Sequence, residues 1–295
     1  MRIRIGTRRS RLALAQAGEV AELLGVHGHE TELVPMTTAG DRGAPADESP
    51  QGTKGLFVAE ITAALAAGDV DLAVHSAKDL PSDDPEGVVV AAVPRRNLPY
   101  DVLVTATGEL PGEATVGTSS LRRQAQLLRA YPRMRVVPFR GNVDTRLRKL
   151  REGEVDAVVL AAAGLDRLGV RPAHAEPIPV DVMVPAPGQG ALAVQARPGD
   201  PAAEAAATLD DRASRRAFEV ERAVVTALGG GCRLPLGAYA EARGEGLRLL
   251  AVVARPDGSE VLRAEIEGDD PDEVAGHAAD QLRAAGADAI LREAS

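Results

Sequence analysis

Four short segments of the sequence bring arginine, lysine, hydroxyl and carboxyl side chains together at turns. They are residues 6–12, 75–81, 116–123 and 139–149. Each segment marks a predicted change from strand to helix, where the free N–H groups of a helix start favour anions. In an open parallel sheet this edge is also where ligands bind. The pattern therefore predicts a site for a negatively charged ligand.

In the first segment Arg8 lies in a turn and Ser10 begins a helix-like pattern. Serine is a preferred N-cap residue because its hydroxyl accepts a hydrogen bond from an exposed N–H group. Two interpretations of the segment stay open: Arg8 binds an anion at the ligand edge, or the segment is a capped surface helix with solvated arginines.

Arg122 and Arg123 stand in the first turn of a predicted helix, after the hydroxyls of Ser119 and Ser120. Positive charge at a helix N-terminus opposes the helix macrodipole by a few tenths to about 1 kcal/mol. The pair therefore predicts an anion that compensates it. The alternative is that both guanidinium groups reach carboxylates elsewhere or extend into water.

In the segment at residues 139–149, Arg140 lies in a turn, and Asn142 and Arg146 share one helical face. These side chains are candidate ligands of the same anion. Arg148 points elsewhere and follows Asp144 by four residues. We expect that pair to form an exposed ion pair worth a few tenths of a kcal/mol, outside the site.

The segment that ends a buried strand at His75 places Lys78 and Asp79 at the same edge. A carboxylate beside a lysine is commonly a structural ion pair. The alternative makes Asp79 a general acid or base, or the group that stabilises a developing cation, held near the reacting atoms by its position at the strand end. The segment alone leaves both open.

The chain has one cysteine, Cys232, which excludes an internal disulfide. It lies in a loop between the glycines at 229–231 and Pro235, rather than on an apolar helical face. A single cysteine is often a buried bystander, whereas a glycine loop favours an exposed thiol that reacts. The spacing leaves both interpretations open.

The remaining sequence predicts the elements that position these groups. Strands are expected at residues 2–5, 33–36, 71–75, 88–93, 101–105, 136–139 and 156–161, and helices at 10–24, 58–67, 121–130 and 143–151. Strand and helix alternate, as in a doubly wound parallel α/β sheet. The fold class is therefore α/β.

Breaks in this alternation predict three domains. Turn residues at 94–99 interrupt it before a second α/β series begins at Asp101, and the Pro- and Gly-rich stretch at 184–190 suits a return to the first domain. Later strands and a long helix predict a small antiparallel unit. The expected domains are two α/β domains, residues 1–95 with 190–208 and residues 100–185, and an α+β domain at 212–295.

Composition argues against several classes of function. Aromatic residues make up 2% of the chain and Trp is absent, so binding of nucleic acid through stacked bases is poorly supported. No run approaches the roughly 20 apolar residues that span a bilayer, no signal peptide begins the chain, and no Cys and His cluster has zinc spacing. We expect a cytoplasmic protein without metal, membrane or nucleic-acid partners.

Together these motifs resemble the porphobilinogen deaminase family along essentially the whole chain. The resemblance is carried by Gly6-Thr-Arg8 with Ser10, Lys54-Gly-Leu-Phe57, His75-Ser-Ala-Lys78-Asp79, Gly117-Thr-Ser119-Ser-Leu-Arg122-Arg123, Arg140-Gly-Asn142 with Arg146, Ala163-Gly-Leu165 with Arg167, Gly188-Gln-Gly190, and Gly231-Cys232 with Pro235. It implies two domains like a hinged periplasmic binding protein and a third that bears a cofactor. Ala59 and Gln195 depart from the family pattern, which often has Lys and Glu there.

The resemblance implies a dipyrromethane cofactor joined to Cys232 by a thioether. Its pyrroles and those of the substrate carry acetate and propionate groups, which guanidinium groups bind in bidentate pairs. The implied cofactor contacts are Ser10, Lys78, Asp79, Ser119, Arg122, Arg123, Arg140 and Arg146. The implied substrate contacts are Arg8, Arg140, Arg146, Arg167, Lys54 and Phe57; an alternative for Phe57 is a core residue.

The implied reaction condenses four porphobilinogen molecules, with loss of ammonia, and releases hydroxymethylbilane by hydrolysis. Asp79 is then the catalytic residue, because a carboxylate can bind pyrrole N–H groups, stabilise a developing cation and help move protons. The family suggests a monomer. The main alternative is a non-catalytic carboxylate-binding protein of the same architecture, which has no use for Cys232. A third possibility is an inactive paralogue.

Overall fold

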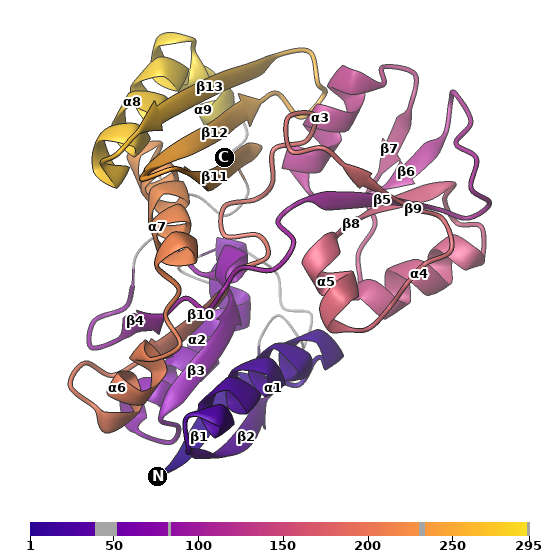
Figure 1. The fold of residues 1–295 in the computed structure, drawn as a ribbon. Helices are drawn as coiled ribbons and strands as arrows, with labels where there is room; N and C mark the ends of the chain where they lie inside the picture. Colours follow the sequence, from indigo (N-terminus) through magenta and orange to yellow (C-terminus); the bar gives the residue numbers. More distant parts are fainter. Residues whose placement is uncertain (39–51, 82–83, 230–233, 294–295) are drawn as a thin grey trace.

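Three β-sheets organise the protein. The computed structural model describes residues 1–38, 52–81, 84–229 and 234–293, with the backbone alone for 52–57. Two sheets have five strands each and the third has three (Figure 1). None of the helices within these described ranges is long and apolar enough to cross a membrane.

The first sheet combines strands from the N-terminal part with one strand that returns later. Its strands are β1 (Arg2–Arg8), β2 (Glu30–Met36), β3 (Leu72–Ser76), β4 (Val89–Ala92) and β10 (Leu192–Ala196), in the order β2-β1-β3-β10-β4. The helices packed on it are α1 (Arg11–Val26), α2 (Gly52–Ala67) and α6 (Pro201–Ala207). Ile3 and Ile5 of β1 are buried in one core with Val20 and Leu24 of α1, as alternating strand positions and helical spacing require.

The second sheet repeats this arrangement. Its strands are β5 (Asp101–Thr105), β6 (Thr115–Gly117), β7 (Arg135–Val137), β8 (Ala157–Ala161) and β9 (Ala175–Ile178), in the order β7-β6-β8-β5-β9. The helices of this part are α3 (Leu121–Ala130), α4 (Val143–Arg151) and α5 (Ala162–Arg167). Both sheets thus have a parallel trio followed by one reversed strand, β10 in the first and β5 in the second.

The reversed strands are those that the chain enters after crossing between the sheets. The chain leaves the first sheet at β4 and enters the second at β5, and it leaves the second at β9 and returns at β10. The two connections at residues 93–100 and 179–191 therefore lie between the sheets (Figure 1). Residues near these connections are placed to contact both halves.

The third sheet is antiparallel, as the sequence predicts. It contains β11 (Leu236–Arg243), β12 (Gly246–Ala254) and β13 (Val261–Gly268), with α7 (Arg212–Ala227), α8 (Pro271–Ala284) and α9 (Ala287–Glu293). Val220 and Val224 of α7 are fully buried with Leu249 of β12 and Leu282 of α8. Helix α7 lies between this unit and the first sheet (Figure 1), and its Phe218 is buried in one apolar cluster with Ala193 of β10.

The predicted strands and helices are present, most within a few residues of their expected ends, although α2 begins at Gly52 rather than at residue 58. Five short elements were missed: η2 (Ala77–Asp79), α5, α6, α9 and β9. The sequence also predicted parallel pairing throughout the α/β part, which is wrong for β5 and β10. Strands in the middle of a covered sheet are apolar on both faces whichever way they run.

Candidate functional site

The turn that carries Lys78 and Asp79 is fixed by a close backbone approach. It is the 3-10 helix η2 (Ala77–Asp79), directly after β3. A Cβ atom on Gly188, where φ is +74°, would stand 2.9 Å from the Ala77 carbonyl carbon and 3.0 Å from the Lys78 nitrogen. Only glycine lets the connection between the sheets lie this close to the turn. The Asp79 carboxylate forms no hydrogen bond or ion pair within the described part of the chain, so it remains available to a ligand.

The motif segments at residues 116–123 and 139–149 pack together next to β6. A Cβ atom on Gly117 would stand 2.7 Å from the Phe139 ring, so glycine allows the two turns to pack together. The Ser119 hydroxyl accepts a hydrogen bond from the Phe139 N–H at 2.9 Å, and Ser120 caps α3 by accepting one from Arg123. The segments carrying Arg123 and Arg140 therefore lie at one edge of the second sheet.

A buried carboxylate, Asp101, lies between the two arginines of α3. Its oxygens are 2.9 Å from Arg122 Nη1 and 2.8 Å from Arg123 Nη2, and Gln189 Nε2 donates to it at 2.9 Å. The Asp101 side chain is fully buried. Burial alone would raise the pKa of Asp101, but Arg122 and Arg123 more than offset that and hold the pKa well below its usual range. The arginine pair thus reaches one carboxylate of its own chain.

Lys78 lies within electrostatic range of this buried group. Burial lowers the pKa of Lys78; Asp79 and Asp101 act to raise it, whereas Arg123 and Arg122 act to lower it. The ammonium group thus shares one environment with the Asp101 network. The strand end at β3 and the start of α3 therefore face each other across the two halves.

Arg146 adds a guanidinium that no carboxylate balances. Its side chain forms no ion pair within the described residues, and its Nε atom is buried without a hydrogen-bond partner there. Burial, and then the charge of Arg123, lower the pKa of Arg146 to about 10. A buried charge without a partner is costly, so this position favours an anionic ligand.

Six ionisable groups form what we call the cationic cluster. They are Lys78, Arg122, Arg123 and Arg146, with Asp79 and Asp101. Four cations face two carboxylates, which leaves an excess of two positive charges. The cluster is therefore suited to a ligand that carries more than one carboxylate.

Arg8 and Ser10 lie at the end of β1, beside the same edge of the first sheet. The Ser10 hydroxyl caps α1 by accepting from the Ala13 N–H at 3.2 Å, as predicted. Burial, and then the charge of Arg8, lower the pKa of His75 to about 4, although its hydrogen bond with Gln195 acts to raise it. His75 is therefore neutral at pH 7.

Arg140 and Arg167 differ in their surroundings. Arg140 is exposed and has no ion-pair partner among the described residues. Arg167 is 4% exposed, and its Nε atom donates to Glu19 of α1 at 2.7 Å, while its Nη2 atom is buried without a partner in that described part. Arg167 thus joins α5 to α1 and keeps one N–H group for another acceptor.

Three predicted site residues fall where side chains are not described. Cys232 lies outside the described residues, so the predicted thiol is not placed. Lys54 and Phe57 belong to α2, of which the structure gives only the backbone at these positions. Within the described ranges, no group of three or more His, Cys, Asp or Glu side chains has the arrangement of a metal site.

The expected ion pair between Asp144 and Arg148 is wrong. Arg148 pairs with Glu152, one helical turn further on, and Asp144 accepts from Arg11 of α1 at 3.1 Å. The predicted pair and the observed pairs all satisfy the same preference of a charged side chain for an opposite charge nearby. Asp144 therefore contributes to the contact between the two α/β halves rather than to α4 alone.

The sequence reasoning missed Asp101 and Gln189 as parts of the site. Asp101 opens β5, and Gln189 lies in the Gly188-Gln-Gly190 turn, where Nε2 donates both to Asp101 and to the Pro99 carbonyl oxygen at 2.7 Å. A signal was present: an acidic residue opens an otherwise apolar strand at the ligand edge. Its partner lies 88 residues away, which spacing does not reveal.

Comparisons with known proteins place nearly the whole chain in one family. Residues 3–205 match the family model described as "Porphobilinogen deaminase, dipyromethane cofactor binding domain", and residues 216–284 match "Porphobilinogen deaminase, C-terminal domain". A porphobilinogen deaminase from Rubrobacter xylanophilus is 49% identical over 98% of this chain and 96% of its own. Another, from Pelotomaculum thermopropionicum, is 46% identical over 99% of this chain and 96% of its own.

Solved structures give a more distant likeness. A probable amino-acid ABC transporter extracellular-binding protein from Bacillus subtilis is similar with a TM-score of 0.41 and 11% identity, over 68% of this chain and 86% of that chain. The BenM effector binding domain with benzoate has the same TM-score of 0.41 and 15% identity, over 69% of this chain and 86% of that one.

Proposed function

Because the chain belongs to the porphobilinogen deaminase family, we propose that its cationic cluster holds the carboxylates of cofactor and substrate while Asp79 acts on the reacting pyrrole. The protein is a transferase that condenses four porphobilinogen molecules head to tail, with loss of ammonia, onto a dipyrromethane primer. Hydrolysis then releases hydroxymethylbilane for haem and porphyrin biosynthesis. The family favours this function over the non-catalytic carboxylate-binding protein.

The excess charge of the cationic cluster is the observation that supports the roles of these residues. Dipyrromethane carries several carboxylates, and the cluster has two positive charges more than its own carboxylates balance. Arg146, with its buried and unpartnered Nε atom, is the clearest candidate to bind one of the cofactor carboxylates. Lys78, Arg122 and Arg123 would bind the other carboxylates, with the hydroxyls of Ser10 and Ser119 at the rim. The residues present therefore fit the cofactor.

When bound, the cofactor supplies the pyrrole carbon on which the chain grows, attached through Cys232. Asp79 supplies a negative charge from a turn that Gly188 holds in place. Its carboxylate accepts hydrogen bonds from pyrrole N–H groups and stabilises the positive charge that develops as ammonia leaves the substrate. It can also take up the proton that is lost after the new bond forms.

Arg8, Arg140, Arg167, Lys54 and Phe57 complete the proposal as substrate contacts. Exposed Arg140 and the free Nη2 atom of Arg167 support these two assignments. We also propose the three domains expected from the sequence, residues 1–95 with 190–208, 100–185 and 212–295. Each sheet lies within one of them, which supports this division.

The intact mass of the purified protein tests this function. We expect a mass above the sequence value by one dipyrromethane, and further increments of one pyrrole after brief incubation with porphobilinogen. The Cys232→Ala variant removes the only thiol and should show the sequence mass alone. An unmodified wild-type protein that stays unmodified would contradict the proposal. We also propose that the protein is a cytoplasmic monomer, and light scattering on the same sample checks its oligomeric state.

Replacing Arg146 by Leu should stall the addition of pyrroles at an early stage. The variant loses a charge-assisted contact worth about 1.5–3 kcal/mol, or roughly a 10- to 100-fold loss of binding. The measurement is the distribution of intact masses after incubation with porphobilinogen. Arg148→Leu, on the exposed side of the same helix and paired with Glu152, is the matched control. Equal mass distributions in the two variants would refute a ligand contact by Arg146.

A further inference from the structure

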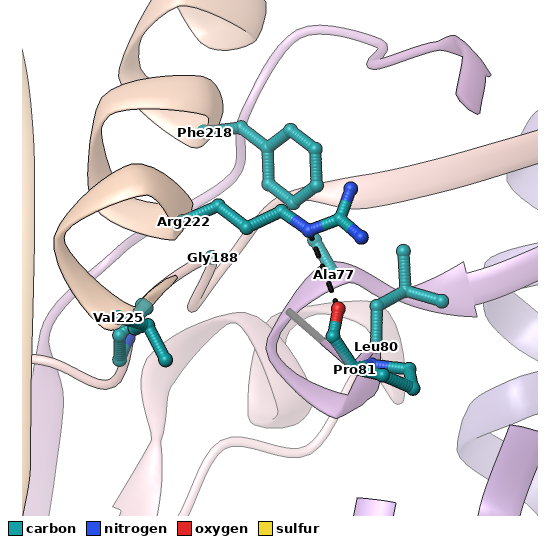
Figure 2. Close-up of a pocket in the computed structure, with 8 residues that line it drawn as sticks. Ala77, Leu80, Pro81, Gly188, Phe218, Arg222 and Val225 are labelled. Atoms are coloured by element: carbon teal, nitrogen blue, oxygen red, sulfur yellow. Dashed lines mark hydrogen bonds between the residues drawn. The ribbon is translucent and has the colours of Figure 1, made fainter. Parts of the chain in front are cut away.

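Helix α7 holds the segment that follows the Asp79 turn through one arginine. The Arg222 Nε atom donates to the Pro81 carbonyl oxygen at 3.2 Å (Figure 2). Its two terminal nitrogens each donate to one oxygen of Asp84, both at 3.0 Å. A single guanidinium therefore fixes both ends of the short stretch that leaves the turn.

Packing on α7 keeps this guanidinium in place. The Arg222 side chain is 17% exposed, and its guanidinium carbon lies 5.6 Å from the centre of the Phe218 ring. Phe218 is buried in one apolar cluster with Ala77 and Leu80 of the turn. Figure 2 shows the Phe218 and Arg222 side chains extending from α7 toward this turn. Helix and turn thus form one packed unit. The planar guanidinium of Arg222 is held more firmly in it than the flexible ammonium group of a lysine would be.

Asp84 is also tied to the first sheet. Gln195 of β10 donates to Asp84 at 3.4 Å, and Gln195 in turn accepts from Thr62 of α2 at 3.3 Å. The residue common to the helix and the sheet is therefore Asp84. The ion pair between Asp84 and Arg222 therefore connects the first sheet, whose strand β3 leads into the Asp79 turn, to the unit that contains α7.

The position of Arg222 along the chain gives this contact a functional meaning. Helix α7 ends at Ala227, and Cys232 follows Arg222 by ten residues. The arginine thus contacts the catalytic turn from the helix that leads to the site of cofactor attachment.

We propose that Arg222, through its bidentate pair with Asp84 and its bond to Pro81, is a positioning residue that sets the place of Asp79 relative to the cofactor. This inference rests on the catalytic role proposed for Asp79. In this role Arg222 affects the rate of each pyrrole addition through Asp79, and it contacts neither substrate nor cofactor. A misplacement of about 1 Å at a reacting group can cost roughly 100-fold in rate.

Arg222→Gln is the first variant, with Arg215→Gln as its matched control. Arg215 stands on the same helix, is 24% exposed, and binds Asp210 and the Val90 carbonyl oxygen, away from the turn. We expect Arg222→Gln to carry the cofactor by intact mass and to melt near the control. Its kcat for porphobilinogen consumption should fall about 10- to 100-fold, with KM within about threefold of the control. A kcat within about twofold of the control would overturn the inference, and so would a loss of cofactor.

Asp84→Asn gives a second test that does not depend on how Arg222→Gln folds. Asp84 is partly exposed, so the variant keeps a folded core, and its amide accepts only one of the two guanidinium bonds. We expect a smaller fall in kcat, about 3- to 10-fold, and a combined variant no slower than Arg222→Gln, because contacting partners are not additive. A wild-type kcat in Asp84→Asn would contradict a positioning role of the Arg222–Asp84 pair. So would a combined variant whose loss of kcat equals the sum of the two single losses in free energy.

Adding Arg222→Gln to Asp79→Asn separates this inference from the proposed function. If Arg222 acts through Asp79, the second substitution causes no further loss of kcat in that background. A further loss of 10-fold or more would mean that Arg222 acts elsewhere, which overturns the inference alone. Normal turnover of the Asp79→Asn variant would instead remove the catalytic role proposed for Asp79, on which the inference rests.

Discussion

The Asp79→Asn variant should be a folded, cofactor-bearing protein whose turnover is reduced by about 10²–10⁴-fold. Asparagine keeps the size of the side chain but carries no negative charge and accepts no proton at neutral pH. The developing positive charge on the substrate is then without its counter-charge. Because Asp79 has no hydrogen-bond or ion-pair partner among the described residues, its replacement breaks no hydrogen bond or ion pair there.

Three measurements on this variant distinguish catalysis from folding. Intact mass checks the cofactor, thermal melting checks stability, and the rate of porphobilinogen consumption gives kcat. Asp69→Asn is the control, because Asp69 is an exposed carboxylate before the opposite end of the same strand. Near-normal turnover in Asp79→Asn would refute the catalytic role, and a melting temperature lowered well below that of the control would assign the loss to folding.

Local features of the site were readable from the sequence. Ser10 caps α1 through a residue three positions later, as predicted, whereas Asn142, predicted as an anion ligand on one helical face with Arg146, caps α4 by accepting from Thr145. Such contacts depend on neighbours within one helical turn, so residue type and spacing suffice to predict them. The strand that ends beside Lys78 and Asp79 was equally clear, because its apolar run stops at that point.

Contacts between distant segments were not readable. The alternatives for Arg122 and Arg123 were an anionic ligand or a carboxylate of the chain, and Asp101 shows that the chain supplies one carboxylate for two arginines. Arg167 binds Glu19, 148 residues away, across the two α/β halves. Pairings of this kind depend on how the domains pack, which periodicity does not encode.

The Asp144–Arg148 error has a related cause. Helical spacing gives each charged side chain several candidates, and here Glu152 lies as close along the helix to Arg148 as Asp144 does. Arg11, which belongs to another part of the fold, takes Asp144. Spacing predicts that an ion pair forms on such a face, whereas tertiary packing decides its members.

Replacing Asp101 by Asn should be the most destabilising single change in the cationic cluster. The fully buried carboxylate serves Arg122 at 2.9 Å and Arg123 at 2.8 Å, and its loss leaves both guanidinium groups without a counter-charge. Breaking a buried ion pair in this way costs about 3–5 kcal/mol. The measurement is the free energy of unfolding in urea. Asp144→Asn, whose carboxylate is 45% exposed, is the control and should cost less than about 1 kcal/mol.

The pH dependence of this stability has a defined sign. The folded pKa of Asp101 is depressed, so its contribution is fully present above the unfolded pKa of about 3.9 and is lost as pH falls below it. Wild-type protein should therefore lose more stability than Asp101→Asn when the pH is lowered from about 5 to 3. Parallel stability curves for the two proteins over that range would contradict the assignment.

The cofactor links this prediction to the function of the cluster. If its carboxylates neutralise the same arginines, they partly replace the charge that Asp101→Asn removes, because binding to the folded state stabilises it. The loss of unfolding free energy caused by Asp101→Asn should then be larger in the Cys232→Ala background, which has no cofactor, than in the cofactor-bearing protein. A double-mutant cycle in urea measures this difference. Equal costs in the two backgrounds would mean that the cofactor carboxylates lie outside the cationic cluster, and the assignment of Arg122 and Arg123 would fail.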